Sequence, residues 1–380
     1  MFSPQALVSA LIAGARRDAA VVLLSIAYLL LAFVDLEMTV STWIGYFFAS
    51  LMGLVAITAL FAAGVRGGYH VLVNRMDRPI TAIIRDIRGV SFATATSYLP
   101  VALAQVILTS VFWPWKTRLP AFSWDATLSD LDRMLHFGWL PWQWLQPVLG
   151  YWPVTFLLSM NYSIWFMVMW TFWMTLAFSE RPQRTPFLIA FALLWILLGS
   201  VLATAFASAG PCFFGNLGLG DNPYAGLMSY LKAADQSAPI FALDVQDLLW
   251  RGYAGSGTEM GISAMPSLHN ATALLMVLAS RSLHPAIQWL LKIHFVLIFL
   301  GSIHLGWHYA VDAYVSYAAT LMIWFGIASR FQSRAPIPHV VLGAPEPQAA
   351  ELPDSSAVVF VRGMNIGMDE PKGGAPGTAS

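Results

Sequence analysis

Two short polar motifs interrupt the most apolar part of the chain, and together they hold the residue types that a phosphoryl transfer requires. The first is the Pro-Ser-Leu-His stretch at residues 266–269, and the second spans residues 304–312. Ionisable side chains are costly inside an apolar segment, so their presence there indicates a function. Phosphoryl transfer needs a nucleophile, an acid for the leaving oxygen and groups that stabilise the phosphate charge.

His308, His269 and Asp312 are the candidate catalytic residues. Asp312 follows His308 by four positions, which places both on one face if a helix begins there. An aspartate that accepts a proton from one imidazole nitrogen leaves the other nitrogen with its lone pair as a nucleophile. We therefore expect His308 to attack phosphorus and His269 to act as the general acid. This arrangement requires no metal and no cofactor, and we expect activity in the presence of a chelator.

The composition is that of a membrane protein. Of the 380 residues, 58% are apolar and only 11% are charged, against about 25% charged in ordinary soluble domains. The 16 Trp and 24 Phe residues add aromatic side chains of the kind enriched at bilayer interfaces. A net charge of zero argues against a nucleic-acid partner, and the single cysteine excludes an intramolecular disulfide.

Apolar segments of roughly 20 residues can cross the hydrocarbon core of a bilayer as helices. The sequence predicts an all-α, polytopic bundle of about eight such helices, and the first is interpreted as a retained span rather than a cleaved signal peptide. Polar residues make the sixth the weakest, as expected of a segment that lines a site. The predicted spans are residues 19–35, 42–65, 97–113, 153–178, 186–208, 263–282, 286–304 and 309–328.

The basic residues lie mostly on one side of the predicted bundle. With the N-terminus in the cytoplasm, the opposite side receives only Lys116, Arg118, Arg133, Lys232 and Arg251 of the 20 basic residues. Cytoplasmic segments carry an excess of Lys and Arg, which supports this orientation. Both polar motifs then face the extracytoplasmic side. We expect a multi-pass protein, with a bacterial plasma membrane favoured over an endomembrane by the compact loops.

Three parts of the chain are predicted. Residues 1–96 contain two N-terminal spans and a basic cytoplasmic link, and residues 97–330 form a six-helix catalytic membrane domain. Residues 331–380 are rich in Pro, Ala, Gly and Ser and are expected to form a disordered cytoplasmic tail. Segments 114–152 and 209–262 are expected to lie outside the spans, on the extracytoplasmic side.

The two polar motifs resemble those of the type 2 phosphatidic acid phosphatase superfamily. The second family motif, Pro-Ser-Gly-His, matches residues 266–269 with Leu268 in place of glycine. The third, Ser-Arg-x5-His-x3-Asp, matches residues 301–312 in spacing and includes a Leu-Gly-x-His-Tyr core. The resemblance covers roughly residues 97–328 and implies the six-helix bundle of that family, to which the first two spans would be an addition.

The resemblance implies that His308 forms a phosphoenzyme, that Asp312 orients it and that His269 is the acid. Two family features are missing. Ser302 stands where the third motif has an arginine, and no Lys-x6-Arg-Pro motif is present, because the Arg-Pro at 181–182 is on the wrong side of the membrane. These departures resemble the inositol phosphorylceramide synthase branch, which transfers a phospho-headgroup between lipids.

Other groups must then bind the phosphate. Ser267 and Ser302 are candidates through their hydroxyl groups, although serine at a helix end is commonly a cap. Lys232 and Arg251 are the basic residues of the outer loop nearest to the site in sequence. All four are predicted phosphate-binding residues.

The sequence thus predicts a membrane enzyme whose substrate is a lipid phosphoester and whose acceptor is a lipid or an alcohol. The first hypothesis is transfer of a phosphate or phospho-headgroup through a phosphohistidine. The alternative is a lipid phosphatase, in which water attacks the phosphohistidine, and the two differ in whether the site excludes water. A third hypothesis is a non-catalytic membrane protein on the same fold, which the two missing family features favour.

Overall fold

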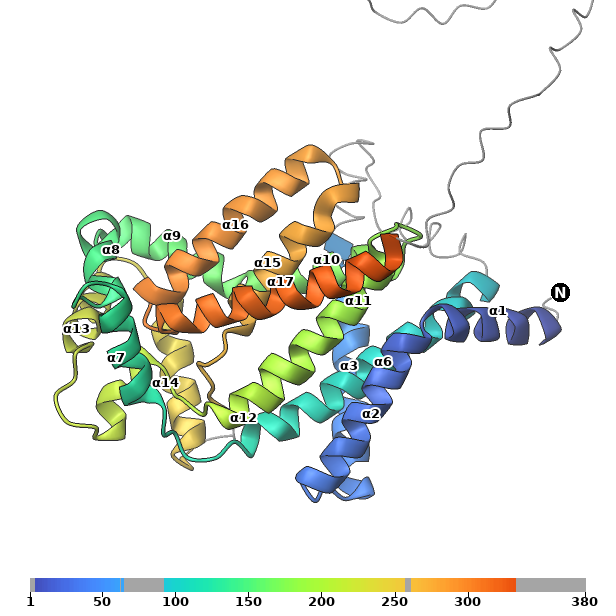
Figure 1. The fold of residues 1–380 in the computed structure, drawn as a ribbon, viewed down its shortest axis with the longest axis horizontal. Helices are drawn as coiled ribbons and strands as arrows, with labels where there is room; N and C mark the ends of the chain where they lie inside the picture. The colour runs from blue at the N-terminus through green and yellow to red at the C-terminus, as the bar shows by residue number, and fades with distance from the viewer. Residues whose placement is uncertain (1–3, 62, 65–91, 257–260, 333–380) are drawn as a thin grey trace, which may run out of the picture. The chain divides into compact units, whose positions relative to one another are not determined.

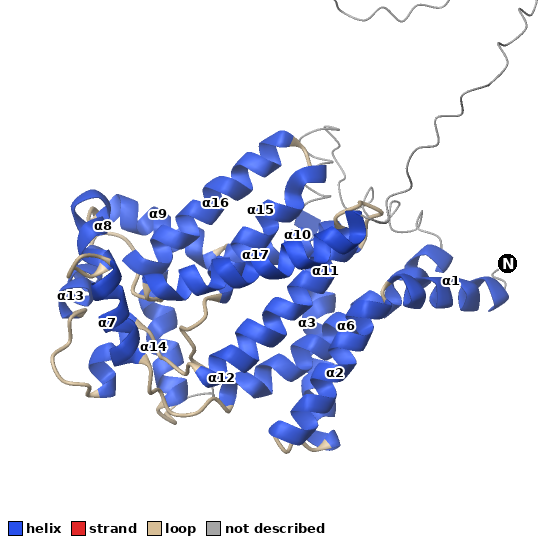
Figure 2. Cartoon of the chain, viewed as in Figure 1, coloured by secondary structure: helices blue, strands red, loops and turns tan. Residues whose placement is uncertain are grey.

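The chain is helical wherever its structure is described, and no strand occurs there (Figure 1, Figure 2). The described part of the computed structural model comprises residues 4–61, 63–64, 92–256 and 261–332. The predicted all-α fold is confirmed. Most of the predicted cytoplasmic link lies outside the described residues, and so does the predicted tail, except for the last two residues of α17.

Six helical segments of the described chain are long and apolar enough to cross a membrane. They are α3 (Val40–Phe61), α6 (Phe92–Thr117), the consecutive α9 (Trp152–Ser163) and α10 (Trp165–Ala177), α11 (Arg184–Leu193) with its continuations η2 (Leu194–Leu202) and α12 (Ala203–Ala205), α16 (Pro285–His304), and α17 (Ala310–Gln332). A seventh results if α1 (Pro4–Arg17) and α2 (Ala19–Asp35), bent by 74° at their junction, count as one span.

The predicted sixth span, over 263–282, differs most from expectation. Its helix α15 covers only Leu268–Ala279, and a 3-10 turn, η4 (Ser280–Ser282), follows it. The polar residues explain the short length, because the Oγ atom of Ser267 accepts the N–H of Asn270 and so caps the N-terminus. α15 is nevertheless central, since it contacts α10, α11, η2, α16 and α17.

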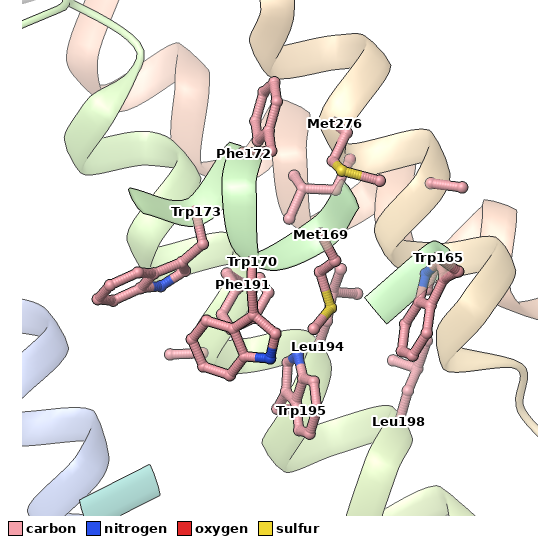
Figure 3. Packing of buried hydrophobic residues seen from close by; sticks show 14 of the residues in the cluster. Trp165, Met169, Trp170, Phe172, Trp173, Phe191, Leu194, Trp195, Leu198 and Met276 are labelled. Atoms are coloured by element: carbon pink, nitrogen blue, oxygen red, sulfur yellow. The ribbon is translucent and has the colours of Figure 1, made fainter. Parts of the chain in front are cut away.

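Large aromatic and sulfur-containing side chains fill the space between α10, α11, η2 and α15 (Figure 3). Trp165, Met169 and Trp173 of α10 meet Trp195 of η2 and Met276 of α15 in this cluster. Helices within a bilayer are no longer exposed to water, so the hydrophobic effect does not drive them together. Their association depends mainly on close packing of such side chains, which maximises dispersion contacts. The cluster lies directly beside the start of α15 and so gives the candidate site a rigid base.

A glycine lets three elements approach closely next to the start of α15. A Cβ atom at Gly199 of η2 would lie 2.8 Å from the ring of Phe112 and 2.9 Å from a methyl group of Leu268. η2 is a π-helical stretch, and such stretches are often found at functional sites. Here the stretch brings α6 and α15 together.

The two N-terminal helices pack against the rest of the bundle. α1 and α2 contact α6, and α2 also contacts α11. At the junction of α1 and α2, the carboxylate of Asp18 accepts hydrogen bonds from the guanidinium of Arg184, and both side chains are buried. Removal of one partner of such a buried pair is strongly destabilising, so this contact fixes the N-terminal helices to α11.

Short helices gather at one end of the bundle, as expected for segments 114–152 and 209–262 (Figure 1, left). They are α7 (Asp125–Leu135), α8 (Pro141–Leu149), η3 (Pro211–Leu217), α13 (Ala225–Asp235) and α14 (Phe241–Tyr253). α7 contacts the start of the chain's last span, α17, while α8 contacts α16. They therefore enclose the connection between α16 and α17, which carries His308.

Candidate active site

His308 lies in the connection between α16 and α17, two residues before α17 begins. The expectation that His308 and Asp312 share one helix face is therefore not met in detail. A turn at Gly306, whose φ is 75°, brings the ring back instead, and the His308 N–H donates to the carbonyl oxygen of Ser302. As a result, Nδ1 of His308 lies 3.3 Å from Oδ2 of Asp312.

A second partner determines which nitrogen of His308 carries the proton. Nδ1 lies 2.9 Å from the carbonyl oxygen of Ala264. Because a carbonyl oxygen only accepts hydrogen bonds, Nδ1 donates and carries the hydrogen. Nε2 of the neutral ring is then the nitrogen with a free lone pair. Asp312, which is fully buried, also accepts the N–H of Tyr309 through Oδ2.

His269 lies in the first turn of α15, close to His308. The centroids of the two imidazole rings are 5.8 Å apart, with 60° between their planes. The His269 ring is held between Tyr162, at a centroid distance of 4.6 Å, and Trp165, at 4.0 Å. The structure therefore brings the three predicted catalytic residues together.

The wall around the two histidines is aromatic and contains unused polar atoms. The ring of Trp307 is parallel to that of Tyr162, with centroids 6.0 Å apart. The Tyr162 hydroxyl, the Trp307 Nε1 and Oδ1 of Asp312 are buried without a hydrogen-bond partner among the described residues. His308 itself is only 5% exposed. Buried polar atoms are normally paired, so these three atoms are available to bond to a polar ligand.

Two buried carboxylates of α7 hold the segment that carries His308. Asp132 accepts the N–H groups of Ala310 and Val311, at 2.8 and 2.9 Å, and so caps the N-terminus of α17. Burial raises the pKa of Asp132 to about 6, although these two hydrogen bonds act in the opposite direction. Asp125 accepts a hydrogen bond from the Tyr309 hydroxyl at 2.8 Å, and burial raises the pKa of that tyrosine.

The role of Asp132 differs from what its surroundings in the sequence suggest. Asp132 precedes Arg133 in an amphipathic segment, which favours a paired surface charge. In the structure, both of its oxygens instead bond to the backbone of α17. The i, i+4, i+7 spacing of Asp125, Ser129 and Asp132 was a usable signal, because it places three polar residues on one helix face that is in fact buried.

The two predicted phosphate-binding serines bond to Asn270. Its Nδ2 donates to Oγ of Ser267 at 3.0 Å and to Oγ of Ser302 at 3.2 Å, and its Oδ1 accepts the Tyr317 hydroxyl proton at 2.7 Å. Ser302 in turn donates to the carbonyl oxygen of Phe299. Both serines are fully buried. Asn270 thus connects the start of α15 to α16 and α17. The hydroxyl hydrogen of Ser302 is already used in its hydrogen bond to Phe299.

The two predicted phosphate-binding cations lie on exposed parts of the outer helices. Lys232 is in the last turn of α13, and its side chain is exposed. Arg251, in the last turn of α14, forms an ion pair with Asp247 on the same helix, and both side chains are 60% exposed. None of their described contacts involves the two histidines.

Lys116, near the end of α6, is a basic residue that lies beside the segment leading to α15. Its backbone touches the segment leading to α15, since a Cβ atom at Gly261 would lie 2.1 Å from the Lys116 carbonyl oxygen. Its Nζ lies 5.5 Å from the centre of the Phe112 ring. No described carboxylate forms an ion pair with it. A half-buried cation without a described counter-ion favours an anionic ligand.

Comparisons with known proteins agree with the motifs. A family model described as the PAP2 superfamily matches residues 126–326, which is more than half of the chain and includes both histidines. No curated protein and no solved structure matches the chain significantly.

Proposed function

Since the chain belongs to the PAP2 superfamily, whose members are generally phosphatases or phosphotransferases, we propose that it transfers a phospho-headgroup. The donor is a lipid phosphoester and the acceptor is a lipid or an alcohol. Transfer proceeds through a covalent phosphohistidine at His308. The observation that supports this most directly is the His269–His308 pair, with ring centroids 5.8 Å apart. The rings are near enough to flank one phosphorus atom.

In the first step, Nε2 of His308 attacks the phosphorus atom of the donor lipid. The N–P bond forms as the bond between phosphorus and the leaving lipid oxygen breaks. His269 gives that oxygen a proton, so the donor leaves as a neutral alcohol. The Nδ1–H of His308, held by Ala264 and Asp312, supports this role because it keeps Nε2 unprotonated and stabilises positive charge on the phosphorylated ring.

In the second step, the hydroxyl group of the acceptor attacks the same phosphorus atom. His269, now neutral, takes the hydroxyl proton, and the N–P bond breaks to release His308. The proton that His269 lost in the first step is thereby restored. The two steps balance without a metal ion or a redox partner.

Lys116 is proposed as the cation that stabilises the transferring phosphate. The family arginine is absent, since Ser302 occupies its position and is bonded to Asn270 and Phe299. Lys116 lies on a different element, has no described carboxylate partner, and its backbone lies against the segment that leads to α15. A preorganised positive charge in a site of low dielectric constant stabilises developing negative charge more strongly than it would in water.

Burial favours transfer over hydrolysis. His308 is 5% exposed and Asp312 is fully buried, behind an aromatic wall that includes Tyr162 and Trp307. Exclusion of water protects a reactive phosphohistidine until an acceptor alcohol arrives. Leu268 and Ser302 depart from the family motifs. These departures support a reaction like that of the inositol phosphorylceramide synthase branch.

The predicted orientation completes the proposal. The apolar helices fit an integral membrane protein, and the distribution of basic residues supports a site on the extracytoplasmic side. The compact loops favour a bacterial plasma membrane. The donor lipid would then come from the outer leaflet.

Product analysis tests the proposal. The purified full-length protein is placed in vesicles of mixed phospholipids, with and without a lipid alcohol acceptor, and products are identified by mass spectrometry. Transfer predicts a new phosphodiester that appears only with acceptor. Attack by water releases headgroup phosphate from a phosphodiester donor and inorganic phosphate from a monoester donor. Either of these as the only phosphorus-containing product, with acceptor present, would contradict transfer and support the phosphatase alternative. Equal turnover by wild type and His308→Ala would support the non-catalytic alternative.

A further inference from the structure

A long apolar groove runs between α9–α10 on one side and α16 on the other. Its volume is about 710 Å³, and Phe172, which lines it, also belongs to the core cluster that supports α15. Side chains that line it include Met167, Val168, Phe172, Ile287, Leu291 and Leu297. Several of its wall residues are exposed, so the groove is open towards the surface that faces lipid in a membrane.

One end of the groove is polar and adjoins the candidate active site. There, Nδ1 of His294 lies 2.9 Å from Oδ1 of Asn161, and both residues line the groove. Because the amide oxygen accepts, His294 donates through Nδ1, and its Nε2 and the Nδ2 of Asn161 remain without described partners. Asn161 directly precedes Tyr162, whose ring stacks on His269.

The direction of the groove matches that of a lipid with its phosphate in the site. α10 and α16 run in opposite directions, and the groove extends from Asn161 and Leu297, nearest His269, to Thr175 and Leu283. A chain that entered at that end would lie along the bundle, away from the phosphate.

We propose that this groove binds a hydrocarbon chain of the lipid substrate while its phosphate lies between His269 and His308. The inference rests on the proposed function, and it adds an expected length for the hydrocarbon chain of the substrate. Within α16 the groove runs from Ile287 to Leu297, about 15 Å at the helical rise of roughly 1.5 Å per residue, and Leu283 extends it beyond the start of the helix. One leaflet contributes about 15 Å of hydrocarbon. The groove therefore fits a chain at least as long as the depth of one leaflet.

Photolabelling tests the proposal without requiring turnover. The probe is eicosyl phosphate with a diazirine at the end of its chain, added to the full-length protein in phosphatidylcholine vesicles. The groove variant is Ile293→Trp, which places an indole at the groove wall. The matched control is Val296→Trp, on the same helix and similarly exposed (50% against 53%) but not lining the groove.

We expect label in peptides from α10 and α16, reduced about tenfold in Ile293→Trp, equivalent to about 1.4 kcal/mol, and unchanged in Val296→Trp. Unlabelled eicosyl phosphate should compete more strongly than eicosanol. Equal labelling of the two variants would overturn the proposal, and so would equal competition by eicosanol, which would indicate bulk lipid. Failure of the proposed function appears separately, as labelling of the groove without any phosphate-transfer product.

Discussion

Nδ1 of His308 is closer to the carbonyl oxygen of Ala264, at 2.9 Å, than to the carboxylate of Asp312, at 3.3 Å. The backbone of the segment before Pro266 therefore contributes to orienting His308, together with the carboxylate that the motif provides. A backbone carbonyl only accepts, so it favours the same tautomer as the carboxylate does. The segment that leads into the first polar motif is thus hydrogen-bonded directly to His308 of the second.

This relationship predicts a limited effect of Asp312→Asn. Where a carboxylate alone sets the histidine tautomer, the change from Asp to Asn lowers kcat by roughly 10⁴-fold. We expect a smaller loss here, because Ala264 continues to hold the hydrogen on Nδ1. Steady-state turnover of the donor lipid measures the difference, with His308→Ala as the reference for complete loss. An Asp312→Asn variant as inactive as His308→Ala would show that the carbonyl contributes nothing.

His269→Ala should lower turnover of a natural lipid donor by about 10² to 10⁴-fold, the range for loss of a general acid. A donor with a nitrophenol leaving group needs no protonation as it departs, so the variant should form the phosphoenzyme from it at close to the wild-type rate. Burst kinetics with both donors measure this step. An equal loss with both donors would contradict the acid role and favour a purely structural one.

Lys116→Gln should lower kcat/KM for the lipid donor by about 10² to 10³-fold, the range for removal of one group that stabilises transition-state charge. The matched control is Arg118→Gln at the same end of α6, because Arg118 is exposed and donates to the carbonyl oxygen of Leu36 instead. Arg118→Gln should remain within a few fold of wild type. Equal small effects of both variants would remove Lys116 from the proposed site.

Asp132→Asn should change the pH dependence of stability. With a pKa of about 6 in the folded protein and 3.8 ordinarily, the folded state binds this proton more tightly. The carboxyl therefore stabilises the fold at low pH, and this contribution, up to about 3 kcal/mol, is lost as the pH rises from about 4 through 6. Thermal unfolding in detergent between pH 4 and 7 should show wild type losing stability relative to Asp132→Asn. Parallel pH profiles would contradict the raised pKa.

The sequence predicted the features that depend on local pattern. Hydropathy located the spanning helices within a few residues, because whether a segment lies in the bilayer depends mainly on the apolar content of that segment itself. The motifs brought attention to His269, His308 and Asp312, which the structure does bring together. The short length of α15 also follows a local cause, the cap at Ser267, but hydropathy averaged over a window conceals it.

Contacts between distant segments were not predictable in the same way. Lys116 was assigned to the outer side of the membrane, yet its place beside Gly261 depends on α6 meeting the segment before α15. The cation choices Lys232 and Arg251 followed closeness in sequence, which says little about distance in a folded bundle. Similarly, Asp132 bonds to Ala310, 178 positions away, and no pattern around Asp132 indicates that partner.

Trapping the covalent intermediate tests the central claim most directly. A donor lipid labelled in its phospho-headgroup is mixed with the enzyme without acceptor, the reaction is quenched in base, and peptides are analysed by mass spectrometry. We predict an acid-labile, base-stable adduct on His308, present in wild type, removed when acceptor is added, and lost in His308→Ala. Full turnover with no adduct at any quench time, or an adduct on another residue that persists in His308→Ala, would contradict the account.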